Sequence, residues 1–160
     1  MIARFQRVHH DWSLFPEKVV VQLNDTHPAV AILELMRILL DEERMDWDQS
    51  WKLVQSTFAY TNHTLLPEAL ETWSEALFEK VLPRHLQIVQ EINRRFIEEE
   101  LNHLFPGNEE QINNMSIFSN GTIRMAFLSV VGSHSVNGVA ALHTKLLKDK
   151  LMKEFCRFIS

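Results

Sequence analysis

Asparagine, histidine and hydroxyl side chains gather in three short clusters of the 160-residue sequence. Each cluster follows an apolar segment: Asn24-Asp25-Thr26-His27, Asn62-His63-Thr64 with Glu68, and Gly132-Ser133-His134-Ser135 with Asn137. In open α/β sheets, ligands bind beyond the carboxyl ends of the strands, beside helix N-termini. Amides, carboxylates, imidazoles and hydroxyls with little net positive charge suit a neutral, polyhydroxylated ligand. The clusters therefore indicate a binding site for such a ligand.

A structural interpretation of the same residues stays open beside this one. Asn, Asp, Ser and Thr before a helix are ordinary N-caps. Single histidines such as His27 and His63 commonly serve as hydrogen-bonded structural residues. Spacing along the chain is compatible with both interpretations.

Other kinds of chemistry have weaker signals. Glu68 and Glu71 could form the acid and base of a glycosidase, although carboxylates three residues apart also suit the first turn of a helix. The histidines lack metal-ligand spacing such as H-E-x-x-H, and the four glycines form no phosphate-binding loop. The single cysteine, Cys156, excludes an intramolecular disulfide and a cysteine-based zinc site. The sequence therefore predicts no metal site.

Charge and hydropathy exclude two classes of partner. Sixteen Lys and Arg against 21 Asp and Glu give a net charge of −5 without a basic stripe, so nucleic-acid binding is not expected. No run of 18 apolar residues suggests a membrane span, and the first 16 residues do not resemble a secretory signal. A lone cysteine fits a reducing compartment, so a cytoplasmic location is expected.

Periodicity predicts one α/β, predominantly helical unit without internal repeats. Few glycines favour helices over a turn-rich β fold. Short strands are expected at 19–23 and 58–61. Helices are expected near Pro28 to Asp41, after an Asp46 cap, from a Ser74 cap to Leu82, from Arg84 to Phe105 after the Pro83 break, and from Val139 to about Lys150.

Several local signals refine these boundaries. Thr26 or His27 is expected to cap the helix near Pro28, and Asp46 with Gln49 has the form of a capping box. Asn120-Gly121 predicts a turn. The remaining segments are a short helix or turn over 111–119, an apolar run over 125–131 of either type, and a glycine-bracketed loop over 132–138.

Three strings that contain these clusters resemble the α-glucan phosphorylases, the family of glycogen, starch and maltodextrin phosphorylases. They are VVVQLNDTHPAVAILELMR (19–37), TFAYTNHTLLPEAL (57–70) and VGSHSVNGVAALH (131–143), and EALFEKVLPRHLQIVQEIN (75–93) resembles the helices that follow the second string. The resemblance covers roughly Pro16 to Lys150 in the family's order. It implies that residues 1–160 are one segment, an incomplete, Rossmann-like part of the N-terminal domain of a GT-B type glycosyltransferase.

The resemblance also implies a reaction and a cofactor. Family members carry out reversible phosphorolysis of α-1,4-glucans to glucose 1-phosphate, with retained configuration. They use pyridoxal phosphate, held by a lysine of a C-terminal domain that this segment lacks. None of the seven lysines here lies in the corresponding glycine-rich motif. We therefore expect no cofactor on this segment, no activity from it alone, and a homodimeric parent enzyme.

Residue roles follow from the matching positions. His63 matches the catalytic histidine, whose ring binds the sugar's primary hydroxyl and whose carbonyl oxygen lies near the anomeric carbon, where it can stabilise an oxocarbenium-like transition state. The remaining positions imply substrate binding: Asp25 and His27 in a polar pocket, Thr64, Glu68, Ala69 and Glu71 on a lining loop, and Asn137 and Val139 beside the sugar. Phe127 departs from the family, in which His or Asn is expected.

Two alternatives stay open. The segment could belong to a non-catalytic carbohydrate-binding or assembly module that retains the scaffold. It could also belong to a glycosidase that uses Glu68 and Glu71. In each case, uncovered sheet edges and apolar helix faces predict self-association of the isolated chain.

Overall fold

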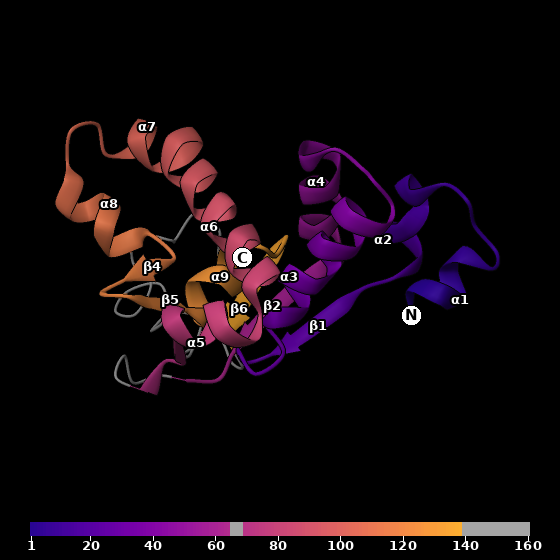
Figure 1. Cartoon of the computed structure of the whole chain (residues 1–160), viewed down its shortest axis with the longest axis horizontal. Helices are drawn as coiled ribbons and strands as arrows, with labels where there is room; N and C mark the ends of the chain where they lie inside the picture. Colours follow the sequence, from indigo (N-terminus) through magenta and orange to yellow (C-terminus); the bar gives the residue numbers. More distant parts are fainter. Residues whose placement is uncertain (65–68, 139–160) are drawn as a thin grey trace.

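A small parallel sheet forms the inner layer of the computed structural model, which describes residues 1–64 and 69–138 (Figure 1). Its strands are β1 (Val21–Asn24), β2 (Phe58–Asn62) and β6 (Ser135–Gly138), in the order β1-β2-β6. Asn24 pairs with Thr61, and Thr61 pairs with Asn137, so the three strands end at one edge. This arrangement confirms the mixed α/β class.

Each strand of this sheet places an apolar or aromatic residue in the core. Leu23, Tyr60 and Val136 are fully buried and lie side by side across the sheet. β2 confirms the strand expected at 58–61. The strand expected at 19–23 is shifted, because the Val19 N–H donates to the carbonyl of Phe15 at 2.9 Å and ends a helix. Val20, which follows, is 68% exposed.

Two helices connect β1 to β2. They are α3 (Val30–Arg37), which runs into a π-helical turn, η2 (Ile38–Glu42), and α4 (Trp47–Thr57). The Asp46 cap is confirmed, since its carboxylate accepts from the Gln49 N–H at 2.9 Å. The caps expected from Thr26 or His27 are wrong. Residues 26–29 form a turn closed by the Ala29 N–H and the Thr26 carbonyl, and α3 starts without a side-chain cap.

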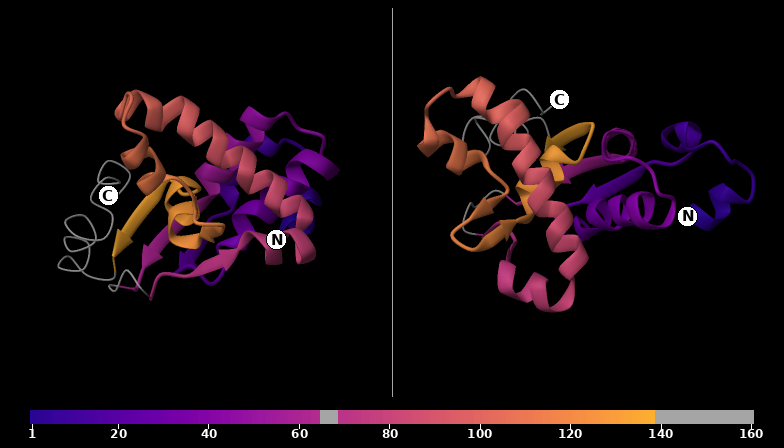
Figure 2. Two further views of the ribbon diagram at one scale, coloured as in Figure 1. Left: turned by 60° about the vertical axis from the view of Figure 1, so that its left-hand side comes forward. Right: turned by 45° about the horizontal axis from the view of Figure 1, so that its top comes forward.

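A long helix runs diagonally across the molecule and packs against α3 and α5 (Figures 1 and 2). It consists of α6 (Pro83–Phe96), a π-helical turn η4 (Ile97–Leu101) and α7 (Asn102–Leu104). The helix before it, α5 (Glu75–Val81), starts at the expected Ser74 cap. Pro83 separates the two as expected, because proline has no N–H to continue α5 but suits the first position of α6.

A second, antiparallel sheet was not expected from the sequence. Its strands are β3 (Thr72–Ser74), β5 (Thr122–Arg124) and β4 (Phe118–Ser119), and α8 (Glu109–Met115) comes directly before β4 in the chain. The turn expected at Asn120-Gly121 is confirmed as the tip of the β4–β5 hairpin. Both residues have positive φ, 50° and 71°, which is why Asn-Gly suits this turn.

The glycine-bracketed segment is only partly a loop. The apolar run before it forms α9 (Met125–Val131), and Ser135–Gly138 is strand β6. Gly132 lies where α9 ends beside α3: a Cβ there would lie 2.8 Å from Ile32 Cδ1, so a larger residue would require the Ile32 side chain to shift. The helix expected from Val139 to Lys150 lies outside the described residues.

The N-terminal residues extend to one side of the sheet (Figure 2). They form α1 (Ile2–Gln6), a 3-10 turn η1 (Trp12–Leu14) and α2 (Phe15–Lys18), joined by an aromatic cluster in which Phe5 and Phe15 meet edge to face at 5.0 Å. Among residues 1–64 and 69–138, no helix is long and apolar enough to cross a membrane.

Candidate functional site

The carboxyl edge of the parallel sheet brings together candidate residues from all three clusters. Asp25 follows β1, His63 follows β2, and Asn137 lies near the end of β6. The side chains of His27, His63, Ala69 and Asn137 are exposed, and those of Asp25, Thr64 and Glu71 are half-buried. Glu68 and Val139 lie outside the described residues.

Asp25 connects the first two clusters. Its φ of 63° and a bond from its N–H to the Thr61 carbonyl turn the chain at the end of β1. One carboxylate oxygen, Oδ2, accepts from the His63 N–H at 3.2 Å and from the Thr64 hydroxyl at 2.9 Å. The other, Oδ1, accepts from the Thr26 N–H at 2.7 Å. The loop after β2 is therefore held by the residue after β1.

Glu71 is held by Thr26, which the sequence patterns assign to a helix cap, and by Trp73, which they did not single out. The Thr26 hydroxyl, on a residue only 3% exposed, donates to Glu71 Oε2 at 2.6 Å. The Trp73 indole N–H donates to Glu71 Oε1 at 2.8 Å. The main-chain carbonyl of Glu71 accepts from Met125 N–H at 3.1 Å. The carboxylate is thus fixed between the end of β1 and the start of β3.

Asn137 belongs to a row of polar side chains that crosses the sheet. The Thr61 hydroxyl donates to Asn137 Oδ1 at 2.8 Å and accepts from the Gln22 amide at 3.0 Å. Gln22 and Thr61 were not among the sequence candidates. Their polar side chains inside short apolar strands were the signal that could have identified them.

The rest of the third cluster lies at the opposite end of the sheet, so Asn137 is the member of this cluster that lies beside the other two clusters. The His134 N–H donates to the carbonyl of Phe58, the first residue of β2, at 3.0 Å. Its Nδ1 lies 3.2 Å from the carbonyl oxygen of Gln55, in the last turn of α4. The cluster is divided because Ser135 and Val136 form a strand rather than a loop.

A buried tyrosine and asparagine lie beneath the His63 loop. Asn62 donates from Nδ2 to the Tyr60 hydroxyl at 2.8 Å and accepts at Oδ1 from the Thr64 N–H at 3.1 Å. Both side chains are fully buried. Burial raises the pKa of the Tyr60 phenol well above its ordinary value, so the hydroxyl is neutral.

Phe127 has a local explanation in this chain. The Arg124 guanidinium lies over its ring, 3.8 Å from the centroid, and donates to the carbonyls of Asn113, Asn114 and Ser116. Burial lowers the pKa of Arg124 to about 10. Phe127 therefore serves packing and a cation–π contact at the second sheet.

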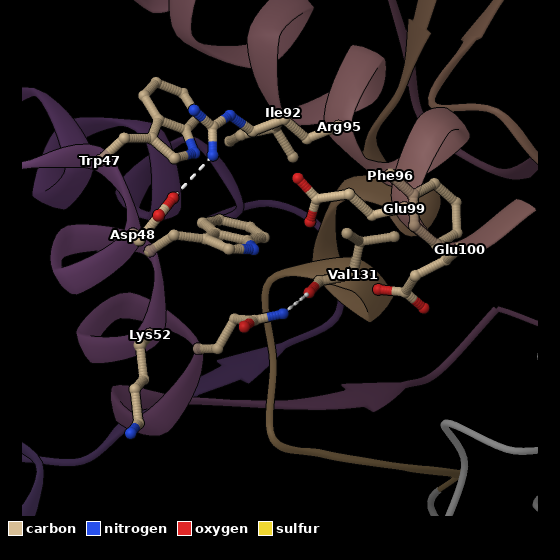
Figure 3. Close-up of a pocket in the computed structure, with 11 residues that line it drawn as sticks. Trp47, Asp48, Lys52, Ile92, Arg95, Phe96, Glu99, Glu100 and Val131 are labelled. Atoms are coloured by element: carbon tan, nitrogen blue, oxygen red, sulfur yellow. Dashed lines mark hydrogen bonds and ion pairs between the residues drawn. The ribbon is translucent and has the colours of Figure 1, made fainter.

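A separate pocket of about 200 Å³ lies between α4, α6 and η4 (Figure 3). It is lined by Trp47 and Trp51 with Arg95, whose guanidinium lies 5.0 Å from the Trp47 ring and forms an ion pair with Asp48. None of the candidate site residues lines it. The described residues also contain no group of three or more His, Cys, Asp or Glu that could hold a metal.

Comparison with known proteins identifies relatives over almost the whole chain. A family model described as carbohydrate phosphorylase matches residues 1–160. Brain-form glycogen phosphorylase of Rattus norvegicus is 52% identical over 144 residues, which is 88% of this chain and 17% of that protein. The muscle form of Homo sapiens is 52% identical over 151 residues, 92% of this chain and 18% of that protein. Glycogen phosphorylase of Saccharomyces cerevisiae is 46% identical over 162 residues, 99% of this chain and 18% of that protein. The chain spans less than a fifth of the length of these relatives.

Proposed function

The chain belongs to the carbohydrate phosphorylase family, and we propose that it forms an incomplete, Rossmann-like part of the N-terminal domain of a GT-B type α-glucan phosphorylase. The whole protein would be a cytoplasmic homodimer that converts α-1,4-glucan and inorganic phosphate reversibly into glucose 1-phosphate. About 50% identity to glycogen phosphorylases supports this reaction class. The parallel sheet, with candidate residues at its carboxyl edge, supports the assignment to a Rossmann-like domain.

The observation that carries the proposal is the bond between the Asp25 carboxylate and the His63 main chain. It joins two family-matched residues from different strands into one site. In this site His63 is the catalytic residue: its ring binds the primary hydroxyl of the reacting glucose, and its carbonyl oxygen faces the anomeric carbon. As positive charge develops on the sugar ring, that oxygen stabilises it.

The other site residues bind the sugar, and their chemistry suits a neutral ligand. They are Asp25, His27, Thr64, Ala69, Glu71 and Asn137, with Glu68 and Val139 from outside the described residues. A carboxylate offers about four acceptor positions. Glu71 therefore keeps acceptor capacity for sugar hydroxyls after the bonds from Thr26 and Trp73.

These residues do not fit pyridoxal phosphate, the cofactor expected from the family. That cofactor needs a lysine for its Schiff base, and its phosphate needs cationic partners. The candidate site residues include neither lysine nor arginine. Lys18, Lys52 and Lys80, the lysines of the described residues, are exposed and lie outside the site. We therefore place the cofactor and the substrate phosphate on other parts of the full-length protein, and expect no phosphorolysis by the 160-residue chain alone.

The test is glucose 1-phosphate formation from maltoheptaose and inorganic phosphate by the full-length protein. His63→Ala should lower kcat at least about 100-fold, the scale of losing a transition-state contact. His134→Ala, at the opposite end of the sheet, is the matched control and should keep wild-type kcat. Release of free glucose without phosphate would favour the glycosidase alternative. A full-length protein that binds glucan without turnover would favour a binding module, and product from the isolated chain would contradict the expected inactivity.

A further inference from the structure

Tyr60 and Asn62 form a buried hydrogen-bonded pair at the end of β2, directly before His63. They are two residues apart on one strand, so their side chains lie on the same face. Asn62 donates to the Tyr60 hydroxyl at 2.8 Å, and its Oδ1 accepts from the Thr64 N–H at 3.1 Å. The pair therefore reaches forward to the peptide group that joins His63 to Thr64.

That contact fixes the direction of the His63 carbonyl. The described residues contain no cis peptide bond. In a planar trans peptide the carbonyl of His63 and the N–H of Thr64 point in opposite directions. Because the N–H points at the buried Asn62 side chain, the carbonyl oxygen points away from it.

The preceding peptide group is held as well. The His63 N–H donates to Asp25 Oδ2 at 3.2 Å, and the same oxygen accepts from the Thr64 hydroxyl. The main chain of His63 is thus fixed on one side by Asp25, the residue after β1, and on the other by the pair in β2. An exposed residue at the end of a strand does not need such contacts from a buried Asn62 and a half-buried Asp25, because water can satisfy its backbone.

We propose that Tyr60 and Asn62 are positioning residues, which aim the His63 carbonyl oxygen at the reacting sugar carbon. This inference rests on the proposed function for the role of that oxygen. Asn62 holds the peptide, and Tyr60 holds the Asn62 amide within the core. Preorganisation of this kind matters most in the transition state, since misplacement of a catalytic group lowers kcat more than it weakens ground-state binding.

Tyr60→Phe in the full-length protein tests the inference, because it removes one hydroxyl and keeps the ring. We expect kcat for phosphorolysis to fall about tenfold with the KM for maltoheptaose within about twofold of wild type. Hydrogen exchange of the Thr64 amide should become faster, while amides within β2 keep their rates. Asn62→Ala, which removes the acceptor itself, should lower kcat further than Tyr60→Phe.

Thr57→Val is the matched control. It also removes a fully buried hydroxyl, one that donates to the Leu53 carbonyl at 2.8 Å just before β2, and should leave kcat and Thr64 exchange unchanged. Wild-type kcat and wild-type Thr64 exchange in Tyr60→Phe would overturn the inference, as would an equal loss in Thr57→Val. A wild-type protein without phosphorolysis would instead contradict the proposed function, while the exchange measurement would still test the Asn62 contact.

Discussion

At the scale of single residues, the site depends on donors that hold carboxylates in place. Thr26 lies between the candidates Asp25 and His27, yet its own side chain is buried and turned toward Glu71. Sequence patterns assign Thr26 to a cap, because hydroxyl residues before helices usually have that role. Its actual partner is 45 positions away in the chain. Local patterns contain no information about such a contact.

Removing the Thr26 hydroxyl should loosen Glu71. We expect Thr26→Val to raise the KM of the full-length protein for maltoheptaose about three- to tenfold, equivalent to about 1 kcal/mol for one lost hydrogen bond. Thr26→Ser keeps the donor and should stay close to wild type. Steady-state kinetics of the two variants check this. If Thr26→Val and Thr26→Ser had the same KM for maltoheptaose, Thr26 would not position Glu71 for the substrate.

At the scale of elements, local signals predicted boundaries well and pairings poorly. The Asp46 and Ser74 caps, the break at Pro83 and the Asn120-Gly121 turn each depend on a few neighbouring residues, and all are confirmed. β6 and the sheet of β3, β5 and β4 were missed. Their strands have two to four residues, too few for a periodic pattern, and depend on partners far along the chain.

The residues of the candidate site also fall into those that the sequence could identify and those that it could not. The resemblance to a family identified Asp25, His63, Thr64 and Glu71, which the structure places at or beside one edge of the sheet. It did not identify Thr26, Asn62 or Trp73, which contact candidate residues: Thr26 and Trp73 donate to the Glu71 carboxylate, and Asn62 accepts from the Thr64 main chain. Contacts of this kind need the three-dimensional arrangement of β1, β2 and β3.

An ion cluster between α3 and α6 gives a prediction about pH. Glu34 accepts from the Arg37 guanidinium and lies 2.7 Å from His85 Nε2, and these contacts, with Arg37 the larger cause, lower the pKa of Glu34 to about 2. A carboxyl group with a depressed folded-state pKa stabilises the fold above its unfolded-state pKa, near 4.5. That stability is lost as the pH falls from about 5 toward 2.

We therefore expect Glu34→Gln to lower the melting temperature at pH 7 and to reduce the difference in melting temperature between pH 7 and pH 3. The loss at pH 7 should be below about 1 kcal/mol, because the Glu34 side chain is 42% exposed and solvent screens the pair. Glu79→Gln, on the exposed face of α5, is the control and should change neither quantity. A pH dependence identical to wild type in Glu34→Gln would contradict the role of this cluster.

At the scale of the whole molecule, apolar surface remains uncovered beside the sheet. Among the described residues β1 is an outer strand, and an outer strand presents unpaired N–H and C=O groups. Met1, Val8 and Val20, near this edge, are 59%, 71% and 68% exposed. With Phe5 and Val19 they form the apolar part of one hollow, which Arg4, His9 and Lys18 also line. Relatives more than five times as long as the aligned segment have further chain that could cover such a surface.

The isolated 160-residue chain should therefore self-associate through this surface. We expect light scattering to give a mass above that of the 18.8 kDa monomer, rising with protein concentration. Val20→Lys should shift the chain toward monomer, because an edge lysine opposes strand pairing and adds positive charge to a hollow that Arg4 and Lys18 already line. Leu77→Lys, which places the same charge on an exposed apolar position of α5, should leave the association unchanged.

A wild-type chain that stays monomeric at every concentration would contradict self-association. If both lysine variants shifted the chain toward monomer equally, the association would depend on exposed apolar surface in general. Only an interface at β1 makes the effect depend on where the lysine is placed.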